Sequence, residues 1–168
     1  LQPSSSDAIF EETNHQLKSL LPNQMLKNMK VEMLCTTDDP IDDLKHHQQI
    51  KKNNFGPKVL PGFRPDKIFG INTEDYLDYL NALADSSGVN INSLQTLLDA
   101  LKSRITYFHE NGCRISDHGL EYTYASDYSL KAVDASLKKR ISGKKISEED
   151  TLAFNSCVLF ELFVMYHE

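Results

Sequence analysis

Three clusters of polar residues have the types and spacing to do chemistry, and each follows a short apolar stretch. Residues 36–40 read Thr-Thr-Asp-Asp-Pro, residues 64–67 read Arg-Pro-Asp-Lys, and residues 117–119 read Asp-His-Gly. An arginine in such a place suits two-pronged binding of a carboxylate or of adjacent hydroxyl groups. Aspartate and histidine suit metal binding, contacts to sugar hydroxyls or proton transfer. These clusters are therefore the candidates for a functional site.

Each cluster also has a purely structural interpretation. Asp38 and Asp39 can cap a helix that begins near Pro40, Arg64 can form a surface ion pair, and residues 117–119 can form a turn. Their recurrence favours function. Three strands in a row would deliver charged groups to one rim, which is costly unless those groups face each other or a charged ligand.

The elements that must position these clusters follow from the apolar pattern. Residues 31–35, 58–63 and 113–116 are short and mostly apolar, which is typical of strands, and the first suits a buried parallel strand. Apolar spacing and capping signals predict seven helices. They run from a cap within residues 4–7 to Leu21, from Asn23, from Ile41 to about Lys52, from Thr73 to the end signal at 85–88, from Asn92 or Ser93 to 111–112, over about 130–141 and from Ser147 to the end. Strands that alternate with helices indicate parallel pairing through right-handed crossovers. We therefore expect an α/β fold, and because three strands are few for a free-standing sheet, we expect the chain to be a piece of a larger barrel or sheet.

Composition excludes several classes of protein. The 168 residues are about one domain's worth, and a net charge of −6 argues against a binder of nucleic acid. Apolar runs are far shorter than the roughly 18 residues that a membrane span needs, so we expect no membrane partner.

The remaining cysteines and histidines give weaker signals. Cys35, Cys113 and Cys157 are far apart and form no CxxC motif, so we expect reduced, buried thiols and a cytoplasmic setting. Cys113 and His118 alone specify little as a metal site. The histidine pair at 46–47 lacks the spacing of a zinc protease motif and is expected on a solvated helix face.

Taken together, the three clusters resemble signatures of one enzyme family. Residues 35–44 read Cys-Thr-Thr-Asp-Asp-Pro-Ile-Asp-Asp-Leu, residues 59–67 read Val-Leu-Pro-Gly-Phe-Arg-Pro-Asp-Lys, and residues 112–119 read Gly-Cys-Arg-Ile-Ser-Asp-His-Gly. In order and separation they resemble the uronate (glucuronate) isomerase family. The resemblance implies a distorted (β/α)₈, TIM-like barrel of the amidohydrolase superfamily. It also implies an aldose–ketose isomerase that interconverts D-glucuronate with D-fructuronate and D-galacturonate with D-tagaturonate, with one divalent metal, usually zinc.

The resemblance also implies roles for residues. Arg64 and Asp117 carry over directly by motif, and His118, Asp38 and Asp39 carry over as further candidates. Asp117 and His118 are then the expected catalytic residues, and Arg64, Asp38 and Asp39 the expected substrate-binding ones. The implied reaction moves a proton between C1 and C2 of an open-chain uronate through an enediol. Arg64 suits the substrate carboxylate or the enediolate charge, and Asp117 suits a sugar hydroxyl.

Two departures from the family matter. Its members are more than twice this length, and their metal-binding His-x-His pair has no counterpart among these residues. We therefore expect a central piece of the barrel, with a helical lead-in over about 1–30, β/α units over 31–119 and a helical segment over 120–168. We expect this piece to hold no metal and to be inactive alone. We expect its full-length parent to bind a sugar acid, and a homo-oligomer is a candidate assembly of that parent. The alternative is a non-catalytic, isomerase-like binding or interaction module.

Overall fold

The computed structural model describes residues 2, 5–53 and 56–167, and the chain divides into two compact units. Unit 1 comprises Leu1–Cys35 and Lys45–Leu60, and unit 2 comprises Thr36–Leu44 and Pro61–Glu168. The first residues of the predicted lead-in (1, 3 and 4) and the final residue of the predicted last helix lie outside the described part.

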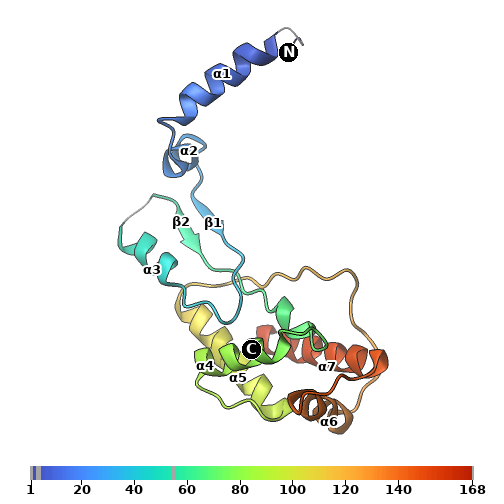
Figure 1. Ribbon diagram of the computed structural model, residues 1–168. Helices are drawn as coiled ribbons and strands as arrows, with labels where there is room; N and C mark the ends of the chain where they lie inside the picture. The colour runs from blue at the N-terminus through green and yellow to red at the C-terminus, as the bar shows by residue number, and fades with distance from the viewer. Residues whose placement is uncertain (1, 3–4, 54–55, 168) are drawn as a thin grey trace. The chain divides into compact units, whose positions relative to one another are not determined.

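Unit 1 contains helices α1 (Ser6–Leu17), α2 (Pro22–Asn28) and α3 (Lys45–Lys52) and strands β1 (Met33–Cys35) and β2 (Lys58–Leu60). The two strands pair in parallel, with Leu34 opposite Val59, and α3 packs against β2. Figure 1 shows β1 and β2 side by side as arrows. The expectation that the first strand is buried is wrong, because β1 pairs with β2 alone and its Met33 side chain is exposed.

The helix predicted from Ile41 begins only at Lys45, and the residues before it explain why. The carboxylate of Asp39 accepts a hydrogen bond from the Ile41 backbone N–H, and that of Asp42 accepts one from Leu44. Such two-residue loops compete with the first helical turn for the same donors. Leu44 also has a positive φ of 53°, which is incompatible with a right-handed helix.

Unit 2 contains the short helix η2 (Asp66–Phe69) and the helices α4 (Tyr76–Ser87), α5 (Leu94–Glu110), α6 (Leu130–Ile141) and α7 (Glu148–His167). Helix α5 packs against α4, α6 and α7, and α6 packs against α7 (Figure 1). All buried hydrophobic side chains of the described residues belong to this unit, and the core includes Phe63, Ile68, Leu83, Leu97, Leu101, Phe108, Leu137, Phe154, Leu159 and Leu162.

Local sequence signals set most helix ends in unit 2. Ser93 and Thr96 form a reciprocal capping box at the start of α5, and Ser129 caps α6 through the Ala132 N–H. Gly88 ends α4 in the left-handed conformation, with a φ of 71°. The prediction of a helix over 130–141 is therefore confirmed. The helix expected from Thr73 starts at Tyr76 instead, because consecutive turns occupy the chain from Gly70 onward.

The third predicted strand, 113–116, is reduced to a single parallel bridge at Ser116. Phe63 forms that bridge, and it also bridges Asp38 in parallel on its other side. The expected parallel order therefore exists in unit 2 at the carboxyl ends of the three segments. Phe63, at the end of the second segment, lies between Asp38, which follows the first, and Ser116, which ends the third.

The cysteines follow the expectation in part. Cys113 and Cys157 are buried thiols, and burial raises the pKa of Cys157 to about 11. The expectation of burial is wrong for Cys35, which is exposed at the end of the lone β1–β2 pair. Among the described residues, no helix is both long and apolar enough to cross a membrane.

Candidate functional site

Backbone hydrogen bonds bring the three polar clusters together at one rim of unit 2. The Asp38 N–H donates to the Gly62 carbonyl at 2.9 Å, and the Arg64 N–H donates to the Asp38 carbonyl at 2.9 Å. On the other side, the Asp117 N–H donates to the Phe63 carbonyl at 3.0 Å. The proximity that the sequence predicted is confirmed.

Arg64 and Asp117 form the charged centre of this rim. One terminal guanidinium nitrogen of Arg64 makes a close ion pair with Asp117 Oδ2, and the Thr37 hydroxyl donates to the same oxygen at 3.4 Å. The side chains of Arg64 and Asp117 are 37% and 40% exposed. A charged ligand from solvent can therefore reach both, although the ion pair alone also fits the surface-pair interpretation.

Asp66 supports Arg64 from within the same cluster. Its Oδ2 atom accepts a hydrogen bond from the Gly119 N–H at 2.7 Å and lies 3.7 Å from Arg64 Nε. A Cβ atom at Gly119 would lie 3.1 Å from that oxygen, so the absence of a side chain allows the close approach. The other oxygen of the Asp66 carboxylate, Oδ1, lies 3.3 Å from His118 Nδ1.

His118 is enclosed, and a residue of the last helix contacts it. Only 13% of its side chain is exposed, and its Nε2 atom lies 3.3 Å from the Tyr166 hydroxyl of α7. Burial, followed by the negative charge of Asp66, raises the pKa of Tyr166 well above its usual value, so the phenol stays protonated.

Sequence reasoning did not select Asp66 or Tyr166 as site residues. Asp66 had a signal, because it follows Arg64 by two positions in the same polar cluster. Tyr166 had none, because 48 residues separate it from His118 and it follows the apolar run 162–165 of α7.

Asp38 and Asp39 bind the loop that carries them. Asp38 Oδ2 accepts hydrogen bonds from the Thr36 hydroxyl at 2.6 Å and from the Gly62 N–H at 3.2 Å. Asp39 accepts a hydrogen bond from the Tyr79 hydroxyl at 3.1 Å, and Lys67 Nζ lies 3.6 Å from its second oxygen. Burial and the negative charge of Asp39 raise the pKa of Tyr79, so its hydroxyl stays a donor. These contacts join the rim to α4.

The carboxylates of the rim do not form a fitting donor set for the divalent metal that the resemblance implies. Among residues 2, 5–53 and 56–167, no three His, Cys, Asp or Glu side chains are grouped so that they can hold a metal ion. Asp66 and Asp117 both face the guanidinium of Arg64, whose positive charge opposes a second cation beside them. This rim is therefore built around an arginine.

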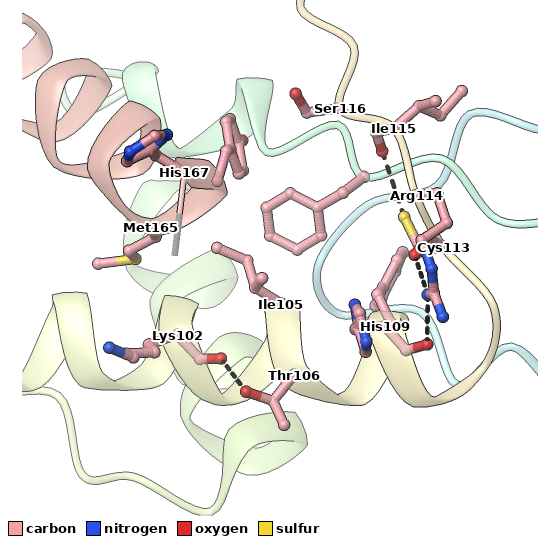
Figure 2. Close-up of a pocket in the computed structure, with 13 residues that line it drawn as sticks. Lys102, Ile105, Thr106, His109, Cys113, Arg114, Ile115, Ser116, Met165 and His167 are labelled. Carbon is pink, nitrogen blue, oxygen red and sulfur yellow. Dashed lines mark hydrogen bonds between the residues drawn. The ribbon is translucent and has the colours of Figure 1, made fainter.

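A cavity of about 680 Å³ lies beside the rim, on the side of the third segment. Figure 2 shows Lys102, Ile105 and Thr106 of α5 on one side and Met165 and His167 of α7 on another. Phe63 and Tyr166 also line it, whereas the five site residues expected from the sequence are not part of its lining. The cavity thus touches the rim through Phe63, Ser116 and Tyr166, which adjoin Arg64, Asp117 and His118.

Comparison with known proteins gives one consistent result. A sequence model of the family described as glucuronate isomerase matches residues 1–168. The chain is 39% identical over 170 residues to a uronate isomerase of Flavobacterium johnsoniae and 36% identical over 171 residues to one of Lachnospira eligens, in each case over 100% of this chain and 36% of the relative.

Solved structures agree with the sequence relatives. The chain superimposes on the crystal structure of a uronate isomerase from Thermotoga maritima with a TM-score of 0.89 and 30% identity, over 99% of this chain and 37% of that one. For a glucuronate isomerase from Caulobacter crescentus the TM-score is 0.85 and the identity 26%, over 98% of this chain and 35% of that one. The chain spans about a third of the length of the proteins it matches.

Proposed function

Because the chain belongs to the glucuronate isomerase family, we propose that it forms the arginine-bearing part of the active site of a uronate isomerase. The substrates are D-glucuronate and D-galacturonate, and the products are D-fructuronate and D-tagaturonate. The 168 residues then form part of a (β/α)₈ barrel of the amidohydrolase type in a cytoplasmic enzyme. The parallel order of the segments at Asp38, Phe63 and Ser116 supports this placement, because functional side chains of such barrels follow the carboxyl ends of parallel strands.

Arg64 carries the proposal. Aldose–ketose isomerisation removes a proton from C2 and adds one to C1, and the intermediate enediol carries negative charge while the oxygens exchange protons. A guanidinium held by Asp66 and Asp117 offers fixed positive charge to the substrate carboxylate or to that enediolate. Such preorganised charge stabilises the transition state without reorganisation.

Asp117 is proposed to accept a hydrogen bond from a substrate hydroxyl. The Thr37 hydroxyl and Arg64 fix its Oδ2 atom, so the carboxylate has a defined direction, and its exposure leaves it open to a sugar. Asp38 and Asp39 are proposed to shape the floor of the site through the loop that they bind. In the complete enzyme a divalent metal would polarise the substrate carbonyl, and residues other than the Arg64 cluster would bind that metal.

The test is Arg64→Lys in a complete isomerase that carries these residues. Lysine keeps the charge but cannot copy the planar, two-pronged donor, so we expect kcat/KM for D-glucuronate to fall by roughly 30- to 1000-fold, equivalent to about 2–4 kcal/mol. The free energy of unfolding is expected to change by no more than about 1 kcal/mol, because the side chain lies at an exposed rim.

Arg114→Lys is the matched control. Arg114 lies on the third segment, is exposed and donates to the backbone carbonyls of His109 and Cys113 instead of to a rim carboxylate. Its replacement is expected to change kcat/KM by less than about fivefold. Near-normal activity of Arg64→Lys would remove Arg64 from the site, and a complete protein that binds uronates without converting them would favour a binding module.

A further inference from the structure

His118 lies between two polar groups, one near each of its ring nitrogens. Nδ1 lies 3.3 Å from Asp66 Oδ1, and Nε2 lies 3.3 Å from the Tyr166 hydroxyl. The aromatic rings of Phe69, Phe163 and Tyr166 surround the imidazole at centroid distances of 6.3, 6.1 and 5.9 Å. The imidazole is enclosed by these groups, and only 13% of its side chain is exposed towards solvent.

The partners determine which nitrogen carries the proton. A carboxylate only accepts hydrogen bonds, so a favourable contact with Asp66 requires a proton on Nδ1. In the neutral ring Nε2 is then an acceptor, and the Tyr166 hydroxyl is the donor that faces it. The buried phenol of Tyr166 keeps its proton, as this role demands.

Asp66 transmits this arrangement to the rim. One of its oxygens faces His118, and the other accepts from the Gly119 N–H at 2.7 Å and lies 3.7 Å from Arg64 Nε. The Asp66 carboxylate, which the Gly119 N–H holds in place, thus lies at ion-pair distance from both His118 and Arg64. Tyr166, His118 and Asp66 thus form a chain that starts in α7 and ends at Arg64.

We propose that His118 is a positioning residue in this chain, held as the Nδ1–H tautomer by Tyr166, and that it orients Arg64 through Asp66 instead of transferring a proton to or from substrate. The proposal rests on the function proposed for Arg64. It replaces the proton-transfer role that the sequence suggested for His118.

Two substitutions of His118 separate positioning from proton transfer. The amide nitrogen of asparagine reaches the place of Nδ1, so His118→Asn keeps a donor towards Asp66, whereas His118→Gln places its amide nearer to Nε2. In a complete isomerase we expect His118→Gln and Asp66→Asn to lower kcat/KM roughly 10- to 100-fold, with most of the change in KM, since a small misplacement of a binding group has effects of that size. His118→Asn should recover about tenfold over His118→Gln. A proton-transfer histidine predicts instead that both variants lose kcat equally.

Tyr166→Phe removes only the hydroxyl, and Tyr122→Phe is its control because Tyr122 is exposed. We expect Tyr166→Phe to lower kcat/KM about three- to tenfold and Tyr122→Phe to leave it unchanged. The ¹⁵N shifts of histidine-labelled protein, assigned to His118 by comparison with His118→Gln, report the tautomer without any assay of activity. We expect the Nδ1–H form in the unchanged protein and a shift away from it in Tyr166→Phe.

The outcomes are distinguishable from failure of the proposed function. An enzyme with no isomerase activity, or an active one that tolerates Arg64→Lys, contradicts the role of Arg64. Normal kinetics of His118→Gln and Tyr166→Phe in an Arg64-dependent enzyme overturns the positioning chain, as does an Nε2–H tautomer of His118.

Discussion

Two buried arginines in unit 2 bind backbone carbonyls and so fix the loops around the rim. Arg104 donates from Nε to the Pro40 carbonyl at 2.6 Å and from its terminal nitrogens to Ser86 and Asp42 at 2.8 and 2.9 Å. Arg140 similarly binds the carbonyls of Ile71 and Thr73. Burial lowers the pKa of Arg104, but an arginine remains charged at neutral pH. Neither contact is visible in the local sequence.

Replacing Arg104 should therefore be among the most damaging single changes to unit 2. Arg104→Met keeps an apolar stem but leaves three carbonyls without their donors, so we expect a loss of about 3 kcal/mol in the free energy of unfolding. Denaturant unfolding of the variant measures it. Arg114→Met, which removes an exposed arginine, should cost less than about 1 kcal/mol. Equal effects of the two changes would show that the carbonyl contacts of Arg104 contribute no stability.

At the scale of elements, the rim depends on how closely the first two segments approach. A Cβ atom at Gly62 would lie 2.5 Å from the Thr36 carbonyl oxygen, and a backbone atom cannot rotate away. The Gly62 N–H also donates to the Asp38 carboxylate, so one position joins the two clusters.

Gly62→Ala is therefore expected to separate these segments. We expect a loss of about 2–3 kcal/mol in the free energy of unfolding, because overpacking forces a backbone shift. Gly88→Ala is the comparison, since a Cβ there meets nothing within 4 Å and the cost is limited to about 1 kcal/mol from its left-handed φ. Thermal melts of both variants show which loses more stability, and a smaller loss for Gly62→Ala than for Gly88→Ala would contradict the close approach.

Helix ends show where local sequence suffices. The capping box at Ser93 and the left-handed Gly88 bring their own hydrogen bonds or conformational freedom, so α4 ends before Gly88 and α5 begins after Ser93, as the sequence predicts. The predicted start at Ile41 failed because Asp39 and Asp42 offer the same acceptor chemistry to a loop. An aspartate that caps a helix and one that closes a loop cannot be told apart from the local sequence. Here Arg104 favours the loop, because it binds the carbonyls of Pro40 and Asp42.

At the scale of the whole molecule, the chain provides charged groups for a site but no metal cluster among its described residues. The 168-residue chain alone is therefore expected to have no uronate isomerase activity. The assay uses D-glucuronate and D-galacturonate, each with and without added Zn²⁺, beside a buffer control. Turnover clearly above that control would contradict the expectation that essential ligands lie elsewhere in the protein.

The sequence by itself determined the family, the alternation of strands and helices, and three polar clusters at strand ends. These are local properties: apolar period, capping residues and short motifs are written in neighbouring positions. The three motifs indicate the family, and the family model and a relative match the chain over its whole length.

Only the tertiary structure decided which charged groups meet and which residues hold them. Asp117 pairs with Arg64 across 53 positions, and Tyr166 reaches His118 across 48. Arg104 likewise closes a loop more than 60 positions away. Such contacts depend on the packing of α5 and α7 and on the register at Phe63, which no local pattern specifies. A side chain's chemistry is fixed by its type, whereas its role depends on partners that the fold brings to it.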